Sequence, residues 1–316
     1  MSQTAITVKV SNIRKVAPTI REFTLTPVDG DFFPFSPGSH VVVEMPAEGK
    51  KIRNAYSLLS DPRDPQSYRI AVRLQPESRG GSIYMHEKVQ LGDELIITPP
   101  SNLFAPDWRA KKHLFFAGGV GITPFMSYIP EMLRQNADFE LYYMYRSTQT
   151  GAYINELKEM LSNRLHAYDS AVSNRADIAK IMAECPQGTH IYICGPESLI
   201  ETILKIGEKT GWPKSHIHYE AFAAPKPGKP FVAELKKSGK TVYVSEDQSL
   251  LEALEANDVE IPNLCRGGVC GQCMSTVIDG EVEHRDNFLS AEEKASNCCI
   301  MPCVSRSKTG RLNLDI

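Results

Sequence analysis

Short runs that alternate apolar and polar residues dominate the first third of the chain. They are Ile6–Val10, Phe23–Val28, His40–Met45, Tyr68–Leu74 and Asp93–Thr98. Period-two alternation indicates strands with one buried face, and the Pro and Gly clusters between the runs indicate turns. Such strands are typical of antiparallel barrels, so we predict a Greek-key β-barrel over residues 1–106.

The pattern changes after residue 106 to apolar runs that alternate with amphipathic helical segments. The runs are His113–Ala117, Phe139–Tyr145, His190–Cys194 and His216–Phe222. This alternation predicts a doubly wound parallel α/β sheet over residues 107–223. Residues 224–230 are rich in Pro and Gly and predict a semi-rigid linker. Residues 231–316 then form a third, compact module with a hairpin near Gly239.

Length and charge fit a multi-domain enzyme that binds no nucleic acid. The 316 residues correspond to two or three domains, and the net charge of −3 comes from interspersed signs rather than a basic face. The N-terminal sequence lacks a basic region followed by an apolar stretch, and no run of eighteen apolar residues occurs. We therefore expect a cytoplasmic protein without a membrane anchor.

The cysteines of the third module carry the most specific chemical signal. Cys265, Cys270 and Cys273 have C-x4-C-x2-C spacing, and Cys303 follows after 29 further residues. Three thiolates in one loop and one distant thiolate are typical of a plant-type [2Fe–2S] cluster, whereas zinc sites favour two close pairs. The loop glycines allow the backbone to curl and point N–H groups at sulfur. The pattern predicts single-electron transfer.

The fourth ligand has competitors, because Cys298 and Cys299 precede Cys303 by only a few residues. Cys303 lies in the apolar run I-M-P-C-V, which can press a sulfur against the loop. We favour Cys303 and interpret the other two as small packing residues.

Two glycine-containing turns in the α/β region predict a nucleotide site. The first apolar strand leads into A-G-G-V-G-I-T-P (residues 117–124) and a helix, and C-G-P (residues 194–196) ends a later strand. Glycines let a diphosphate approach the backbone, and a helix N-terminus offers unpaired N–H groups. Ligand sites in such sheets lie at the carboxyl ends of strands, so the two turns support each other.

The barrel carries a second phosphate signal. Arg53, Tyr56 and Ser57 lie along one strand, and S-R-G-G-S-I (residues 78–83) opens a helix. A Gly-Gly-Ser helix start can cradle an anion, and an arginine can add a bidentate contact. The alternative is an edge-strand tyrosine and an ordinary helix cap. Beside a nucleotide domain, a flavin phosphate is the preferred ligand.

Together these motifs resemble the phthalate dioxygenase reductase family, within the ferredoxin–NADP reductase superfamily, over essentially the whole chain. The resemblance implies a flavin barrel, an NAD(P)H domain and a β-grasp [2Fe–2S] ferredoxin. It also implies electron transfer from NADH through FMN and the cluster to a Rieske-type oxygenase, with FAD less favoured than FMN. Four short segments are further similar to carnitine monooxygenase reductases: N-A-Y-S-L-L-S, I-A-V-R-L, N-L-F-A and H-R-D. Vanillate demethylase and aromatic-ring dioxygenase reductases share the layout.

The resemblance also implies site residues. On the flavin it places Arg53, Ala55, Tyr56, Ser57, Ala71, Arg73, Gly80, Gly81 and Ser82. On the pyridine nucleotide it places Gly119, Gly121, Thr123, Arg146, Gly195 and Pro196. Cys194 would lie beside the nicotinamide, with Glu220 and Phe222 near the flavin. Hydride transfer then requires proximity and orientation rather than an acid or base.

The choice between NADH and NADPH depends on the residues that follow Phe139–Tyr145. NADH-specific relatives often carry Asp directly after the arginine, but here Ser147 follows Arg146. An acidic residue there would bind ribose hydroxyls and repel a 2′-phosphate. We favour NADH and keep NADPH as an alternative.

Two other functions fit these motifs less well than an electron-transfer subunit does. A self-sufficient flavin-dependent ferric or quinone reductase would not need the cluster, and a ferredoxin or redox sensor would not need two nucleotide loops. For docking on the oxygenase, Arg266 and Arg285 are candidate steering residues. The alternative for Arg266 is that it fixes the conformation of the cluster loop.

Overall fold

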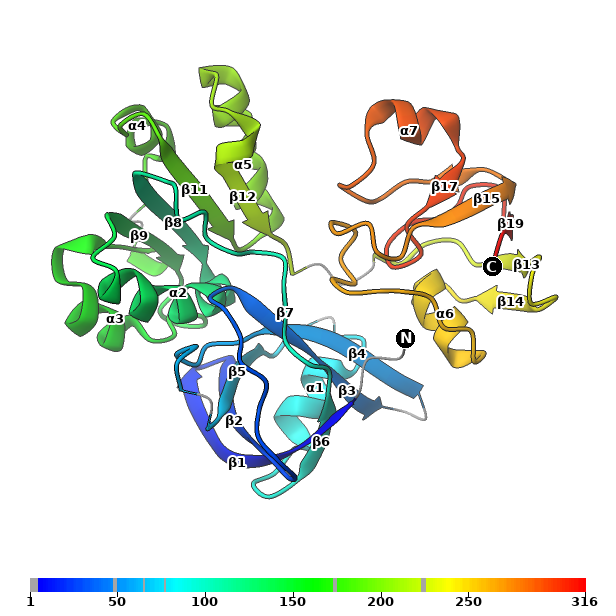
Figure 1. Cartoon of the computed structure of the whole chain (residues 1–316), viewed down its shortest axis with the longest axis horizontal. Coiled ribbons are helices and arrows are strands. Elements are labelled where there is room, and N and C mark those ends of the chain that lie inside the picture. The colour runs from blue at the N-terminus through cyan, green and yellow to red at the C-terminus, as the bar shows by residue number, and fades with distance from the viewer. Residues whose placement is uncertain (1–4, 48–49, 65, 77, 173–174, 223–225) are drawn as a thin grey trace. The chain divides into compact units, whose positions relative to one another are not determined.

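The computed structural model describes residues 5–47, 50–64, 66–76, 78–172, 175–222 and 226–316. The chain divides into two compact units, one of residues 1–47 and 53–222 and one of residues 48–52 and 223–316 (Figure 1). Residues 224 and 225 of the expected linker lie outside the described part. Within that part, no helix is both long and apolar enough to cross a membrane.

The first unit begins with the antiparallel sheet that the sequence predicts, apart from residues 50–52 of β4, which are grouped with the second unit. Its strand order is β4-β3-β6-β1-β2-β5, and β7 pairs with β3. The elements are β1 (Ile6–Ala17), β2 (Ile20–Pro27), β3 (Ser39–Ala47), β4 (Lys50–Ser57), β5 (Tyr68–Arg73), α1 (Gly81–Glu87), β6 (Glu94–Ile97) and β7 (Ser101–Asn102). Alternate side chains such as Val8, Val10, Phe23 and Leu25 are buried, because successive residues of a strand face opposite sides.

The second half of this unit is a parallel sheet of order β10-β9-β8-β11-β12. Its elements are β8 (Lys112–Gly118), η1 (Gly119–Ile122), α2 (Thr123–Arg134), β9 (Phe139–Tyr145), α3 (Ile154–Leu161), η2 (Ser162–Arg164), β10 (Leu165–Asp169), η3 (Ser170–Val172), α4 (Ile178–Ala183), β11 (Thr189–Cys194), α5 (Glu197–Thr210), η4 (Lys214–His216) and β12 (Ile217–Glu220). The chain enters at the centre with β8, moves out to β10 and returns to β11. The reversal creates a switch point between β8 and β11, where such sheets bind ligands.

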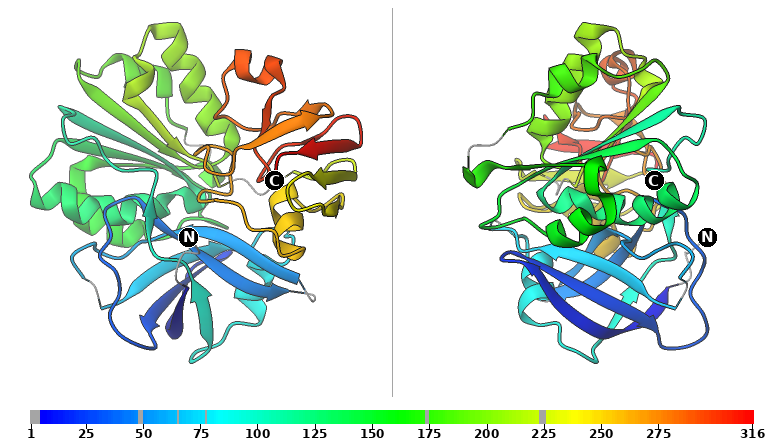
Figure 2. Two further views of the ribbon diagram at one scale, coloured as in Figure 1. Left: turned by 45° about the vertical axis from the view of Figure 1, so that its right-hand side comes forward. Right: turned by 90° about the vertical axis from the view of Figure 1, so that its left-hand side faces the viewer.

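Helices cover both faces of this sheet (Figures 1 and 2). Phe115 and Tyr143 pack with Phe125 of α2 on one face, whereas Phe116 packs with Ile203 of α5 on the other. Strands buried on both sides explain the continuous apolar runs in the sequence. The first core also includes barrel residues, among them Ala17, Ile20, Leu59 and Phe104. Barrel and parallel sheet therefore share one core.

The second unit is a small mixed sheet of order β14-β13-β19-β15-β17, with a separate β16-β18 pair. Its elements are β13 (Phe231–Leu235), β14 (Thr241–Val244), α6 (Leu250–Ala256), β15 (Ser275–Asp279), β16 (Val282–Glu283), α7 (Ala291–Ser296), β17 (Cys299–Ile300), β18 (Arg306–Ser307) and β19 (Arg311–Leu314). Ser249 and Glu252 form a capping box at α6. Leu250 and Leu254 of that helix complete the core against the sheet.

Candidate functional site

The carboxyl ends of the five parallel strands meet at one edge of the sheet. At that edge Cys194 is in register with Ala117 on one side and with Glu220 on the other. Further along, Asp169 is in register with Tyr145. The edge therefore collects residues from segments more than a hundred positions apart.

The two glycine turns approach each other closely at the switch point. A side chain at Gly121 would place its Cβ 2.1 Å from the carbonyl oxygen of Cys194, and one at Gly118 would lie 2.5 Å from the Pro196 ring. Gly119 has a φ of 55°, a conformation that favours glycine. Only glycines allow this approach of β8 to β11.

The helix that follows this turn presents its N-terminus to the same edge. Thr123 is the first residue of α2 and is buried, and Pro124 lies in the first turn. Among the described residues no side chain caps the helix. The N–H of Thr123 already donates to the carbonyl of Val120, and Pro124 has no N–H. An anion such as a diphosphate would therefore be bound by the turn Gly119–Ile122 that leads into the helix.

Cys194 and Glu220 lie side by side at the ends of β11 and β12. The Cys194 side chain is fully buried, and burial with the nearby charge of Glu220 raises its pKa well above the usual value. The thiol therefore stays neutral and contributes shape rather than a nucleophile. Ser57 Oγ of the barrel donates to Glu220 Oε2 over 3.2 Å, whereas Phe222 is exposed. The barrel and the sheet edge thus meet at Glu220.

The expected flavin residues of the barrel lie in different environments. Burial raises the pKa of Tyr56 to about 12, so its hydroxyl remains protonated. Arg53 is bonded through two nitrogens to Glu44 Oε2, at 3.0 and 2.8 Å. By contrast, the buried Nε of Arg73 has no hydrogen-bond partner in the part of the chain that the structure describes. A buried cationic donor without an acceptor suits an anionic ligand.

The segment after Arg73 folds back toward the start of α1. Ser82 Oγ is buried, lies 2.9 Å from Ser78 Oγ and accepts from the backbone N–H of Gln75 at 3.1 Å. Gly80 precedes the helix with a φ of 112°. Ala55 lies on β4 and Ala71 on β5, where a small side chain leaves room beside the sheet.

The four predicted cluster ligands form two close pairs in the second unit. Cys273 Sγ and Cys303 Sγ are 3.3 Å apart, and the thiols of Cys265 and Cys270 share a hydrogen bond. That bond, with loop N–H groups, lowers the pKa of Cys265 to about 5 despite burial. The cysteines therefore form two pairs, an arrangement that fits two iron atoms with two thiolates each. Cys298 is exposed, and its sulfur lies 3.8 Å from that of Cys299.

The cluster loop is shaped by two glycines with left-handed backbone conformations. Gly268 and Gly271 have φ near 75°, where other residues are strained. A Cβ at Gly271 would lie 2.3 Å from the Phe288 ring, and one at Gly268 would lie 2.6 Å from Val304. The loop backbone therefore packs directly against Phe288 and Val304. In this conformation a backbone N–H group of the loop lies near a cysteine sulfur. Gly267 N donates to Cys265 Sγ at 3.4 Å.

Arg266 fixes the loop rather than facing a partner. Its two terminal nitrogens bind both oxygens of Glu255 at 2.7 and 2.8 Å, and only 9% of its side chain is exposed. Arg285 binds Glu283 and donates to the carbonyl of Lys226 at 2.6 Å. Both arginines are committed within the unit, so the expectation that they steer an acidic partner receives no support from the geometry.

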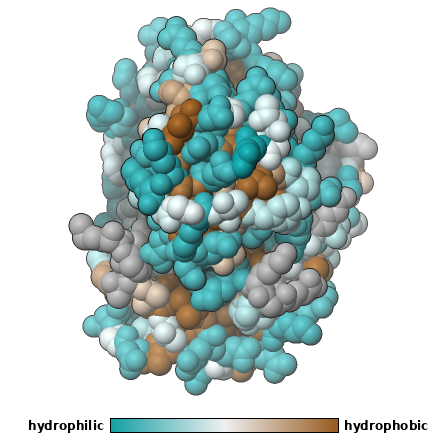
Figure 3. Space-filling view, turned by 90° about the vertical axis from the view of Figure 1, so that its right-hand side faces the viewer, coloured by the Kyte–Doolittle hydropathy of each residue, from teal (hydrophilic) through white to brown (hydrophobic). Residues whose placement is uncertain are grey.

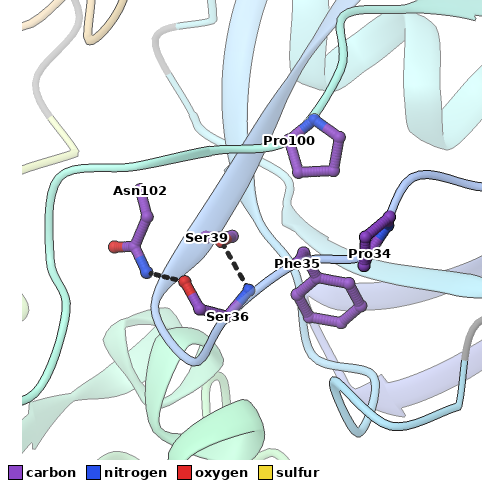
Figure 4. A pocket seen from close by; sticks show the side chains of 6 residues that line it. All are labelled: Pro34, Phe35, Ser36, Ser39, Pro100 and Asn102. Carbon is purple, nitrogen blue, oxygen red and sulfur yellow. Dashed lines mark hydrogen bonds between the residues drawn. The ribbon is translucent and has the colours of Figure 1, made fainter.

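Surface features add little to these sites. On the face in Figure 3, apolar side chains lie in separate small groups among hydrophilic ones. A hollow of about 320 Å³ on the barrel contains none of the predicted site residues (Figure 4). Its polar groups bond to each other, since Asn102 Nδ2 donates to Ser36 Oγ at 2.7 Å and Ser36 N to Ser39 Oγ at 3.3 Å.

Two groups near the parallel sheet escaped the sequence analysis. Asp169, at the end of β10, accepts from the backbone N–H of Ser147 over 3.0 Å. Histidines also stack near the amino ends of β11 and β12, away from the carboxyl edge of the sheet. There His190 Nδ1 is 3.0 Å from His218 Nε2. The His190 ring stacks on that of His216 with centroids 4.1 Å apart. The sequence signal for this histidine group is that H-I-Y (residues 190–192) and H-I-H (residues 216–218) both begin apolar runs.

Comparisons with known proteins agree with this geometry. Residues 233–308 match the 2Fe-2S iron-sulfur cluster binding domain, and residues 95–217 match the N-terminal domain of dimethylamine monooxygenase subunit DmmA-like proteins. The heme-dependent oxidative N-demethylase beta subunit of Ectopseudomonas mendocina (strain ymp) is 49% identical over 99% of both chains. The carnitine monooxygenase reductase subunit of Escherichia coli (strain K12) is 41% identical over 98% of both.

A solved structure covers both units. It is phthalate dioxygenase reductase, described as a modular structure for electron transfer from pyridine nucleotides to [2Fe-2S]. The TM-score is 0.86 with 31% identity, over 99% of this chain and 98% of that one.

Proposed function

The chain belongs to the phthalate dioxygenase reductase family of oxygenase reductase subunits, and we propose that it takes electrons from NADH through FMN and its [2Fe–2S] cluster to an amine-oxidising oxygenase. The reductase class and the cluster domain rest on matches along the whole chain. The flavin, the residue roles, the oxygenase and a cytoplasmic location are our proposals.

The pyridine nucleotide lies, in this proposal, across the carboxyl edge of the parallel sheet. Gly119, Gly121 and Thr123 hold the diphosphate, because the backbone at positions 119 and 121 requires glycine and the turn leads directly to the buried Thr123 at the start of α2. Gly195 and Pro196 form the opposite wall. Cys194 and Glu220 border the nicotinamide, and a neutral, buried thiol there excludes water without competing as a nucleophile.

The flavin belongs at the junction of barrel and sheet edge. The bond between Ser57 and Glu220 supports this position, since it joins the two halves where a hydride must cross. Arg73 is the best candidate for the flavin phosphate, because its buried Nε awaits an acceptor. Tyr56 offers a protonated hydroxyl and an aromatic face. A flavin accepts two electrons as hydride and releases them singly.

The proposed identity of the electron acceptor rests on two matches. The 49% identity to an oxidative N-demethylase beta subunit, together with the DmmA-like match, favours an oxygenase that removes methyl groups from a small alkylamine. We therefore propose a haem-dependent acceptor ahead of the Rieske-type acceptor that the family resemblance implies. The 41% identity to a carnitine monooxygenase reductase supports a second candidate, a Rieske-type oxygenase of a quaternary amine.

Reconstitution distinguishes these acceptors. The purified chain with NADH is mixed anaerobically with either candidate oxygenase, and reduction is followed by the haem absorption band or by the Rieske electron paramagnetic resonance signal. In air, formaldehyde release from dimethylamine and turnover of carnitine are compared. We expect fast haem reduction and formaldehyde release from dimethylamine. Fast reduction of the Rieske protein alone would favour the second candidate, and reduction of neither would contradict the proposed function.

Cofactor analysis provides a separate check. The purified chain should release FMN and contain two irons and two sulfides. Release of FAD would contradict the flavin assignment, and zinc without acid-labile sulfide would contradict the cluster assignment.

A further inference from the structure

The adenosine end of the proposed nucleotide site lies at the ends of β9 and β10. Arg146 and Ser147 follow β9 and are exposed. An acidic side chain at this point of a nucleotide-binding sheet bonds the ribose hydroxyls and repels a 2′-phosphate. The segment after β9 supplies only a cation and hydroxyls, which by themselves would tolerate NADPH.

The structure brings a carboxylate to this place from the neighbouring strand. Asp169 is the last residue of β10, in register with Tyr145 at the end of β9. Its Oδ1 accepts from the backbone N–H of Ser147 at 3.0 Å and from that of Ala171 at 2.9 Å. Ser170 Oγ donates to the carbonyl of Tyr145 at 3.2 Å, which further ties the two strand ends together.

Asp169 remains available to solvent and stays ionised. Hydrogen bonds from the Ser147 side chain and from two backbone N–H groups lower the pKa of its carboxyl. Both backbone bonds use Oδ1, so they fix the orientation of the carboxylate while its second oxygen still has capacity to accept.

We infer that Asp169 sets the preference for NADH over NADPH, by accepting a ribose hydroxyl in NADH and repelling the 2′-phosphate of NADPH. This inference rests on the proposed nucleotide site. β10 is three strands from β11, where Cys194 borders the nicotinamide. With strands ~4.8 Å apart, this is a span of roughly 14 Å across the edge. An extended dinucleotide that crosses the switch point reaches Asp169 with its adenosine ribose.

The opposing charge at this site is Arg146, which would attract a 2′-phosphate. Its backbone N–H donates to Thr150 Oγ1 at 3.2 Å, so the turn that carries it is fixed close to Asp169. NADPH therefore meets one attractive and one repulsive charge, whereas NADH meets a carboxylate that can accept its hydroxyl. Loss of the carboxylate leaves the cation unopposed.

The test uses Asp169→Asn, which keeps an oxygen acceptor for the two backbone N–H groups but removes the charge. The ratio of kcat/KM for NADH to that for NADPH is measured with ferricyanide as acceptor. Asp169→Asn should lower this ratio on the order of tenfold, equivalent to ~1.4 kcal/mol. Most of the change should be in KM. Added salt should reduce the discrimination of the unaltered protein more than that of the variant.

Two further variants make the outcome specific. The double variant Asp169→Asn/Ser147→Asp places a carboxylate after β9, the strand next to β10. The preference for NADH should recover in this variant. Asp64→Asn is the matched control, because exposed Asp64 also accepts a backbone N–H, from Gln66 at 3.2 Å, but lies in the barrel. An unchanged ratio in Asp169→Asn, an equal loss with both nucleotides, or an NADPH preference of the unaltered protein would overturn the inference. Failure of both nucleotides to reduce the unaltered protein would instead contradict the proposed function.

Discussion

Removing the guanidinium of Arg266 should loosen the cluster loop. Arg266 has a φ of 51°, a strained conformation for arginine, and its bidentate bond to Glu255 holds it there. The two side chains are 9% and 13% exposed. Breaking a buried pair by removing one partner costs 3–5 kcal/mol, and the remaining exposure indicates the lower end, about 3 kcal/mol. Arg266→Ala should therefore destabilise the second unit by this amount.

The assay is loss of the visible cluster absorbance after a fixed incubation in urea, since cluster loss is irreversible. At equilibrium, a denaturant dependence of about 2 kcal/mol per molar would convert this destabilisation into a fall of roughly 1.5 M. Because the loss is irreversible, the apparent midpoint should fall by at most this amount. Lys237→Ala is the control: its pair with Asp315 is exposed, so a change of at most about 1 kcal/mol is expected. The double variant Arg266→Ala/Glu255→Ala should cost less than the sum of the single variants.

A different pattern would refute this reasoning. If Arg266→Ala retains the urea midpoint of the unaltered protein but slows reduction of the oxygenase in a salt-dependent manner, Arg266 faces the partner. The ion pair with Glu255 would then be incidental to the stability of the loop.

Three other changes have defined outcomes. Cys303→Ser should abolish the cluster absorbance while NADH still reduces the flavin, and Cys299→Ser should retain both properties. The reverse result would show that Cys299, not Cys303, is the fourth cluster ligand. Gly121→Ala should cost about 1–3 kcal/mol in thermal unfolding and raise KM for NADH, because its Cβ would meet a carbonyl oxygen of β11 at 2.1 Å; unchanged kinetics would contradict the close approach. Burial lowers the pKa of His190 and lowers that of His218 to about 4. Below pH 6.5 the unfolded chain therefore binds more protons than the folded chain, and the folded state loses stability as the pH falls. The melting temperature should therefore fall by roughly 5 °C from pH 7 to pH 5, less steeply in His218→Gln.

The sequence predicts those parts of this protein that local chemistry determines. Period-two runs mark the barrel, and apolar runs mark the parallel strands because helices bury both of their faces. The spacing of Cys265, Cys270 and Cys273 identifies the cluster loop because a short loop must supply three thiolates. The glycines of residues 117–124 identify the turn at the switch point, since only glycine permits that approach.

What the sequence could not predict depends on contacts between distant strands. Asp169 and Ser147 are 22 residues apart and meet only because β10 pairs with β9 in a particular register. Glu255 likewise meets Arg266 through the packing of α6, which removed Arg266 from the candidate steering residues. The family resemblance places Arg73 near the flavin, but its unpartnered Nε becomes visible only when burial and hydrogen bonds of the described residues are known.

The same reductase architecture can serve different oxygenases because the cluster is the last electron carrier of the proposed reductase. In the proposed function, electrons leave one at a time, whichever metal receives them, and the residues at the sheet edge bind only the electron donor. Discrimination between acceptors must then reside in a contact near the cluster loop, and transient electron-transfer contacts are small. Arg266 and Arg285 are already bonded to Glu255 and Glu283. Steering by charge must therefore come from other side chains, and exchanging only these two arginines between relatives should not exchange their oxygenases.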